Sequence, residues 1–197
     1  DVLIPRDDTV AVAEIAIRQA LFLDQNPRIL DLCTGSGCIG IAIASRVKDA
    51  KVTLADLSRE ALAVAKKNVV LHHMTGRVSC VQADAMAAPP AFLGQFDMIV
   101  SNPPYIDAKD MEGLEVSVKD FEPHLALYGG EDGLDFYKAI VEQGREWLKD
   151  GGWLFFEIGY DQGEDLKSLL NEFGYTEIEV RQDLAGLDRV ALGRKGA

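Results

Sequence analysis

Short apolar runs alternate with longer segments of helical periodicity along most of this chain. The apolar runs predict strands at residues 28–32, 52–56, 78–82, 98–101, 153–158, 176–181 and 189–193. Apolar residues at helical spacing predict helices at residues 9–23, 39–47, 59–71, 134–148 and 162–173. Strands that alternate with helices in this way predict an α/β fold, with a mostly parallel sheet and helices on both faces.

Several predicted boundaries carry local signals. We expect Ser58 to cap the helix that follows it, because a serine oxygen accepts a hydrogen bond from a free N–H of the first turn. Gly151-Gly152 and Gly174 are expected to stop the helices that precede them. The run 153–158 is nearly all apolar, which predicts a strand that is buried on both faces.

The chain has 197 residues, of which 48% are hydrophobic, and this fits one domain with a substantial core. We expect residues 1–24 to form the end of a linker and a leading helix, and residues 25–197 to form the main domain. The acidic stretch 106–133 is long for a loop in a compact domain. Loops of this length usually bind a ligand or cover a site.

The formal net charge of −12 argues against a protein that holds nucleic acid by its phosphates, which requires a basic face. No apolar stretch approaches the roughly 18 residues of a membrane span. The first residues lack a basic segment followed by an apolar run, so they predict no signal peptide. We therefore expect a cytoplasmic protein with no direct nucleic acid or membrane partner.

The three cysteines, Cys33, Cys38 and Cys80, are odd in number and have no C-x-x-C spacing. We expect them to be free, buried thiols in a reducing compartment. The adjacent side chains of His72 and His73 point in different directions, so the sequence predicts no metal site.

A glycine-rich segment joins the first predicted strand to the helix after it. Gly35-Ser36-Gly37-Cys38-Ile39-Gly40 matches the pattern G-x-G-x-x-G, and Asp56 ends the next strand, as in sites for nicotinamide dinucleotides. The glycines by themselves indicate only a tight turn and a close approach of a ligand to the backbone.

Acidic residues distinguish between possible ligands of this loop. Asp31, near the end of the first strand, is unfavourable beside a pyrophosphate but favourable beside an ammonium and a sulfonium. S-adenosylmethionine carries both groups. The loop is expected to pack against its methionine part and sugar, while Asp56 accepts hydrogen bonds from the ribose hydroxyls. Asp84, after the third strand, is expected either to reach the adenine amine or to cap a turn.

The sequence Asn102-Pro103-Pro104-Tyr105 directly follows the fourth predicted strand. Each proline fixes its φ at about −65°, and Pro104 pushes Pro103 toward an extended conformation. The Asn102 side-chain carbonyl and the Pro103 backbone carbonyl thus form a stiff pair of acceptors beside the Tyr105 ring. This arrangement suits a planar NH₂ group, such as an amide or an exocyclic base amine, presented to an electrophile. We expect Asn102, Pro103 and Tyr105 to be catalytic and all four residues to bind substrate.

The chain closely resembles the HemK/PrmC family, which are peptide chain release factor N5-glutamine methyltransferases. Four segments carry the resemblance: Leu3-Ile4-Pro5-Arg6-Asp7-Asp8-Thr9, Asp31-Leu32-Cys33-Thr34-Gly35-Ser36-Gly37, Ile99-Val100-Ser101-Asn102-Pro103-Pro104-Tyr105-Ile106 and Asp183-Leu184-Ala185-Gly186-Leu187-Asp188-Arg189. Three further segments are similar to the family: Phe121-Glu122-Pro123, Gly129-Gly130-Glu131-Asp132-Gly133-Leu134 and Glu157-Ile158-Gly159. The resemblance implies a class I S-adenosylmethionine-dependent methyltransferase with a Rossmann-like, seven-stranded sheet.

The resemblance also implies roles for individual positions. The residues expected to line the S-adenosylmethionine pocket are Cys33, Thr34, Gly35, Ser36 and Gly37. Asp56 is expected to hold the ribose and Ala85, after Asp84, to lie beside the adenine. Asn102 is expected to touch both cofactor and substrate. The implied substrate is the glutamine of the Gly-Gly-Gln motif in class 1 release factors, and the implied cofactor product is S-adenosylhomocysteine.

The sequence departs from the family pattern in three places. Cys33 stands where members usually have glycine. Pro5-Arg6-Asp7-Asp8-Thr9-Val10 replaces the usual Pro-Arg-Pro-Asp-Thr-Glu. The N-terminal helical domain of the family, which helps grip the release factor, is expected to be absent from this chain.

Three other interpretations stay open at this point. An N6-adenine or other amine methyltransferase acting on DNA or RNA would use the same Asn-Pro-Pro-Tyr chemistry, although the −12 charge argues against it. A nicotinamide-dependent dehydrogenase would rest on the glycine pattern alone. A catalytically inactive binding module would need a damaged pocket, whereas the acidic, glycine and Asn-Pro-Pro-Tyr residues are all present.

Overall fold

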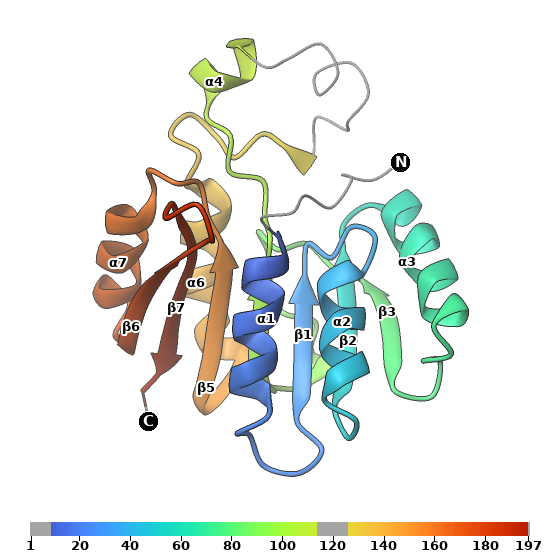
Figure 1. Cartoon of the computed structure of the whole chain (residues 1–197). Coiled ribbons are helices and arrows are strands. Elements are labelled where there is room, and N and C mark those ends of the chain that lie inside the picture. The colour runs from blue at the N-terminus through green and yellow to red at the C-terminus, as the bar shows by residue number, and fades with distance from the viewer. Residues whose placement is uncertain (1–8, 114–125, 197) are drawn as a thin grey trace.

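The computed structural model describes residues 9–113 and 126–196. In this part of the chain, seven strands form one sheet in the order β3-β2-β1-β4-β5-β7-β6 (Figure 1). The strands are β1 (Arg28–Leu32), β2 (Lys51–Asp56), β3 (Val78–Gln82), β4 (Phe96–Ser101), β5 (Leu148–Glu157), β6 (Tyr175–Gln182) and β7 (Asp188–Lys195). β7 runs antiparallel to both of its neighbours and the others are parallel, so the predicted mostly parallel sheet is confirmed.

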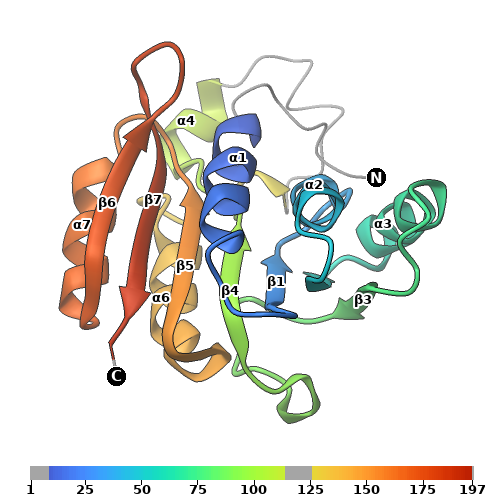
Figure 2. The same ribbon diagram turned by 60° about the horizontal axis from the view of Figure 1, so that its bottom comes forward.

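Helices cover both faces of the sheet, also as predicted (Figures 1 and 2). One face carries α1 (Thr9–Ala20), α2 (Cys38–Arg46) and α3 (Arg59–Leu71). The other carries α6 (Asp135–Trp147) and α7 (Gly163–Glu172). Two short helices, η1 (Ala91–Leu93) and α4 (Ala108–Gly113), lie in the connections on either side of β4.

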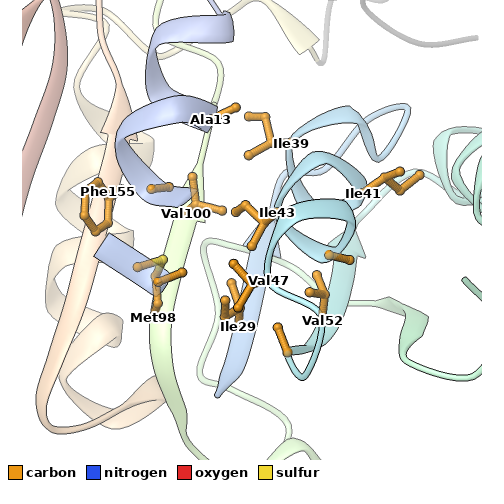
Figure 3. Packing of buried hydrophobic residues seen from close by; sticks show 14 of the residues in the cluster. Ala13, Ile29, Ile39, Ile41, Ile43, Val47, Val52, Met98, Val100 and Phe155 are labelled. Atoms are coloured by element: carbon orange, nitrogen blue, oxygen red, sulfur yellow. The ribbon is translucent and has the colours of Figure 1, made fainter. Parts of the chain in front are cut away.

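Neighbouring residues of the central strands belong to opposite cores. Met98 packs with α1 and α2, whereas Ile99 packs with α6 and α7. Figure 3 shows the first core, in which Ile43 of α2 and Val47, the residue directly after this helix, lie over Ile29 of β1. Successive side chains of a strand point to opposite faces, so strands covered on both sides need apolar residues at nearly every position.

The leading helix α1 belongs to the first of these cores. Its residues Val12, Ala16 and Ala20 are almost fully buried in the same cluster as the strands. The helix therefore packs on the sheet with the rest of the chain. Whether a domain boundary lies at residue 24 stays a prediction.

Two of the three predicted local signals mark helix boundaries correctly. Ser58 Oγ accepts a hydrogen bond from Ala61 N at 3.1 Å, which confirms the predicted cap. α7 ends at Glu172, two residues before Gly174, whose φ is +74°. The predicted long connection 106–133 contains α4 and a parallel bridge between Ile106 and Tyr128, while residues 114–125 lie outside the described part.

The expectation that Gly151-Gly152 would stop the preceding helix was wrong. α6 ends at Trp147, and Leu148 already has an extended conformation with φ −94° and ψ 140°. Both glycines lie inside β5, where the register against β4 shifts. Burial of the Trp147 and Leu148 side chains decides this boundary, because it brings the chain back to the sheet before the glycines are reached.

Candidate active site

A cavity of about 520 Å³ opens at the carboxyl ends of the first four strands. Its wall consists of the segments that follow β1, β2, β3 and β4, together with Ala126 and the starts of α1 and α6. β1 and β4 are neighbours in the sheet although two strands separate them in the sequence. The cavity thus lies at the point where the strand order reverses, which is the usual ligand site of such sheets.

Most of the predicted site residues lie on this wall. They are Cys33, Thr34, Gly35, Ser36, Asp56, Asp84, Ala85, Asn102 and Pro104. Four others do not line the cavity: Asp31, Gly37, Pro103 and Tyr105. The fold therefore brings the glycine-rich loop, the two predicted carboxylates Asp56 and Asp84, and Asn102 to one site.

Asp31 lies behind the glycine-rich loop and has no exposed surface. Its Oδ2 accepts hydrogen bonds from Thr34 Oγ1 at 2.7 Å and from Gly40 N at 2.8 Å. Its Oδ1 is buried and accepts no hydrogen bond from the described parts of the chain. Burial raises the pKa of this carboxyl to about 7, even though the two hydrogen bonds act in the opposite direction. Asp31 thus holds the loop to the start of α2.

The glycine-rich loop leaves room for a ligand at Gly35. The φ of Gly35 is +55°, and a Cβ placed there would meet nothing within 4 Å. At Gly37 the requirement is internal, because its φ is +82° and a Cβ would lie 2.9 Å from Leu54 Cδ1. Asn68 Nδ2 of α3 donates to Ser36 O at 2.8 Å and supports the loop from the side. The backbone of the loop is therefore held in place, and the space beside Gly35 in the cavity is free for a ligand.

Asp56 connects this loop to the start of α3. Its Oδ2 accepts from Gly35 N at 2.8 Å and its Oδ1 accepts from Ser58 N at 2.9 Å. Each oxygen keeps a further lone pair that can accept a hydrogen bond from a ligand. Asp84 Oδ1 similarly accepts from Met86 N at 2.8 Å, so Asp84 caps a turn and also lines the cavity.

The charged side chains of the cavity wall favour a cationic ligand over a pyrophosphate. The described wall contains three carboxylates, Asp56, Glu60 and Asp84, and one cation, Arg59. Arg59 Nε donates to Gln82 Oε1 at 3.2 Å, outside the cavity wall. A bound pyrophosphate would meet more negative than positive charge, whereas a sulfonium and an ammonium would be attracted. S-adenosylmethionine therefore fits this wall better than a nicotinamide dinucleotide.

Cys33 occupies a backbone conformation that favours glycine. Its φ is +59°, in the left-handed region, which costs a non-glycine residue roughly 1–2 kcal/mol. This explains why glycine is usual at this position of the resembling family. Burial raises the pKa of the Cys33 thiol well above its ordinary value and that of Cys38 to about 11, so neither is a ready thiolate. All three cysteines are free but only partly buried.

The Asn-Pro-Pro-Tyr turn packs against a glycine-rich segment that precedes α6. A Cβ on Gly129 would lie 2.6 Å from Tyr105 Cα and 2.8 Å from Pro104 O. Ile106 N donates to Leu127 O at 3.0 Å, and Gly129 N donates to Ile106 O at 2.9 Å. The Tyr105 side chain packs with the second core. The two segments thus form one unit although 23 residues lie between Tyr105 and Gly129 in the sequence.

The sequence analysis missed several residues of the wall. Leu57, Met86 and Phe136 supply large apolar side chains, and Leu57 and Met86 are about half exposed. Leu57 and Met86 follow the polar residues at the ends of β2 and β3, so their positions offered a signal. Phe136 lies in the first turn of α6, far away in sequence, and nothing local marked it. Among the described residues, no three potential metal ligands cluster.

Comparisons with known proteins agree with this geometry. The family model described as "Methyltransferase small domain" matches residues 14–119. The release factor glutamine methyltransferase of Clostridium acetobutylicum is 41% identical over 195 residues, which cover 99% of this chain and 68% of that protein. That of Geobacter sulfurreducens is 40% identical, with 99% and 66% covered. The chain thus spans about two thirds of the length of these relatives.

Solved structures give the same result. The release factor-specific protein-(glutamine-N5) methyltransferase of Alicyclobacillus acidocaldarius has a TM-score of 0.60 and 28% identity, with 98% of this chain and 95% of that chain covered. The ribosomal protein L11 methylase of Lactobacillus delbrueckii subsp. bulgaricus has a TM-score of 0.69 at 21% identity, with 98% and 81% covered, which shows the fold alone. A class I methyltransferase fold, a cavity at its switch point and close relatives over nearly the whole chain lead to one conclusion: this chain belongs to the release factor glutamine methyltransferase family.

Proposed function

We propose that this domain transfers a methyl group from S-adenosylmethionine to the side-chain amide nitrogen, N5, of the glutamine in the Gly-Gly-Gln motif of peptide chain release factors. The observation that carries the proposal is the position of Asn102. This amide lies on the wall of the same cavity as the glycine-rich loop and Asp56. A group that binds an NH₂ therefore lies within reach of the proposed cofactor site.

Asp56 is the proposed ribose ligand, and the backbone of residues 33–36 is the proposed surface for the methionine part. Asp84 and Ala85 are proposed to border the adenine, between the apolar side chains of Leu57 and Met86. Asp31 does not line the cavity; it supports the loop from behind through its hydrogen bonds with Thr34 and Gly40. The carboxylates of the wall accept hydrogen bonds and carry negative charge, so they fit a ligand with hydroxyls and positive charge.

When it is bound, S-adenosylmethionine supplies an electrophilic methyl group on a sulfonium. The substrate amide nitrogen is a weak nucleophile, because its lone pair is delocalised into the carbonyl. The Asn102 side-chain carbonyl and the Pro103 backbone carbonyl are proposed to accept one amide N–H each and to orient the nitrogen. Orientation of this kind can contribute roughly 7–11 kcal/mol to the reduction of a reaction barrier.

A strong general base is not required for this reaction. The amide nitrogen becomes acidic only after it gains the methyl group, so its proton can leave afterwards to water. The carboxylates of the described wall are Asp56, Glu60 and Asp84, at the proposed cofactor side. None of them is adjacent to Asn102 in the sequence. Pro104, on the wall, is proposed to exclude water next to the amide, and Tyr105 to support the turn from behind.

The proposed protein partner is a class 1 release factor, and this substrate assigns the reaction to the cytoplasm, where peptide release takes place. No helix in the described residues is both long and apolar enough to span a membrane. A nucleic acid substrate would bring many phosphates to a chain with a net charge of −12, which disfavours it.

The test is methyl transfer from labelled S-adenosylmethionine to a purified release factor. The matched control is the same factor with asparagine at the motif glutamine, and duplex DNA and RNA are assayed in parallel. Label on the glutamine form only is the expected result. Label on nucleic acid would replace the proposal with the amine methyltransferase alternative. Absence of label on all of them, with cofactor still bound, would overturn the proposed substrate for this domain.

A further inference from the structure

We infer that Gln162 is a positioning residue that holds the Asn-Pro-Pro-Tyr turn in its reactive geometry. The inference rests on the proposed function for its effect on catalysis, but the contacts that carry it do not. Gln162 precedes α7 and is only 9% exposed. It does not line the cavity, so it acts through the turn and not on a ligand.

Four hydrogen bonds converge on the carboxamide of Gln162. Its Nε2 donates to Tyr105 O at 3.2 Å and to Gly133 O at 3.4 Å. Its Oε1 accepts from Gly159 N at 2.9 Å and from Tyr137 Oη at 3.4 Å. One side chain thus connects the turn after β4, the segment before α6, the segment after β5 and the hydroxyl of Tyr137 in α6.

The turn needs such a support because of its own composition. Two of its four residues are prolines, which have no N–H to donate, so the turn has few ways to bond to its surroundings. Tyr105 O is the backbone acceptor at its end, and Gln162 supplies the donor. A carboxamide has two N–H donors and an oxygen acceptor, which match the two carbonyls on one side and the N–H and O–H on the other.

The carboxyl end of β5, to which Gln162 is bonded, is itself fixed. Tyr137 Oη shares its single proton between Gln162 Oε1 and the nearer Glu157 O, which lies 2.9 Å away, and Arg189 Nη1 donates to Ile158 O at 3.4 Å. Arg189 in turn lies 3.3 Å from the carboxylate of Asp183. The Gln162 amide is therefore anchored on the rigid sheet and transmits that rigidity to the turn that carries Asn102.

The test compares Gln162→Glu with Gln95→Glu in the same domain. Gln162→Glu keeps size and the acceptor side but turns a carboxylate oxygen toward two carbonyls. Gln95 is a control for the hydrogen-bond pattern at an exposed position, because its Nε2 also donates to two carbonyls, Glu146 O at 3.3 Å and Leu148 O at 3.2 Å. Gln95 lies before β4, at the opposite end of the strands from the cavity. Gln162→Met provides a second variant, which removes the four bonds without adding a charge.

We expect both Gln162 variants to lower kcat on the release factor by about ten- to a hundredfold, since a misplacement of about 1 Å has effects of this size. The dissociation constant for S-adenosylmethionine should stay within about twofold, because Gln162 does not line the cavity. Gln95→Glu should keep both values. Val52→Ala, a core variant remote from the turn, shows how much kcat falls from lost stability alone.

Hydrogen exchange gives a readout that does not need activity. The amides of Ile106 and Gly129, which bond across the turn, should exchange faster in both Gln162 variants than in Gln95→Glu or Val52→Ala. Unchanged exchange at these amides, or a kcat loss no larger than that of Val52→Ala at equal stability, would overturn the inference. If the unmodified domain does not methylate the release factor, the proposed function fails, while the exchange result still decides the role of Gln162.

Discussion

Substitution of Asp31 by asparagine tests the energetic cost of burying this carboxyl. The asparagine side chain would keep the shape of the original one, and its oxygen would still accept from Thr34 Oγ1 and Gly40 N. Its NH₂ group would replace Asp31 Oδ1, which accepts no hydrogen bond from the described residues. The substitution therefore removes a buried charge and leaves the bonds that hold the loop.

The magnitude follows from the pKa of Asp31 in the two states. In the folded protein, burial raises this pKa to about 7, whereas the ordinary value of 3.8 applies to the unfolded chain. Between these values the folded state keeps a proton that the unfolded state has lost, so the free energy of unfolding falls as the pH rises. A rise of about three pKa units, at about 1.4 kcal/mol each, corresponds to a loss of about 4 kcal/mol above pH 7.

The assay is urea unfolding of the unmodified domain and of Asp31→Asn at several pH values from about 4 to 8. The difference between the two curves removes the contribution of every group that does not interact with Asp31. We expect Asp31→Asn to gain stability relative to the parent as the pH rises, by up to about 4 kcal/mol. Parallel curves across this range would refute the reasoning and show that the carboxyl ionises without cost.

Further predictions concern single positions of the site. Asp56→Ala should weaken S-adenosylmethionine binding by about one to two decades in calorimetric titration, and an unchanged dissociation constant would remove Asp56 from the site. Asn102→Ala should bind cofactor almost normally but lose about two decades of methyl transfer, and activity within a few-fold of the parent would contradict its role. Gly129→Ala should lower the free energy of unfolding by about 1–3 kcal/mol, since its Cβ would lie 2.6 Å from a Cα of the Asn-Pro-Pro-Tyr turn; a denaturation curve like that of the parent would disprove this close approach. Cys33→Gly should raise the free energy of unfolding by about 1 kcal/mol by relieving a positive φ, which a destabilised variant would argue against.

Local sequence predicted much of the fold and the main parts of the site. The periodicities located the helices and strands, because a strand buried on both faces must be apolar throughout and a covering helix must be apolar on one side. The glycine-rich loop, the carboxylates after the strands and the Asn-Pro-Pro-Tyr turn were recognisable because each depends on residue types in a short segment. The glycine pattern alone matched a site for a nicotinamide dinucleotide, whereas the nearby acidic residues argued against a pyrophosphate ligand.

Tertiary structure decided which residues meet. Gly151-Gly152 lies within β5 because burial of Trp147 and Leu148 ended α6 earlier. Asp31 lies behind the loop and not on the cavity wall, and the same burial raises its pKa.

Phe136 on the wall and Gln162 at Tyr105 O come from segments far away in the sequence. The reason is physical: a sequence pattern reports the preferences of neighbouring residues, whereas burial, charge and hydrogen-bond partners depend on segments that become neighbours only when the sheet assembles.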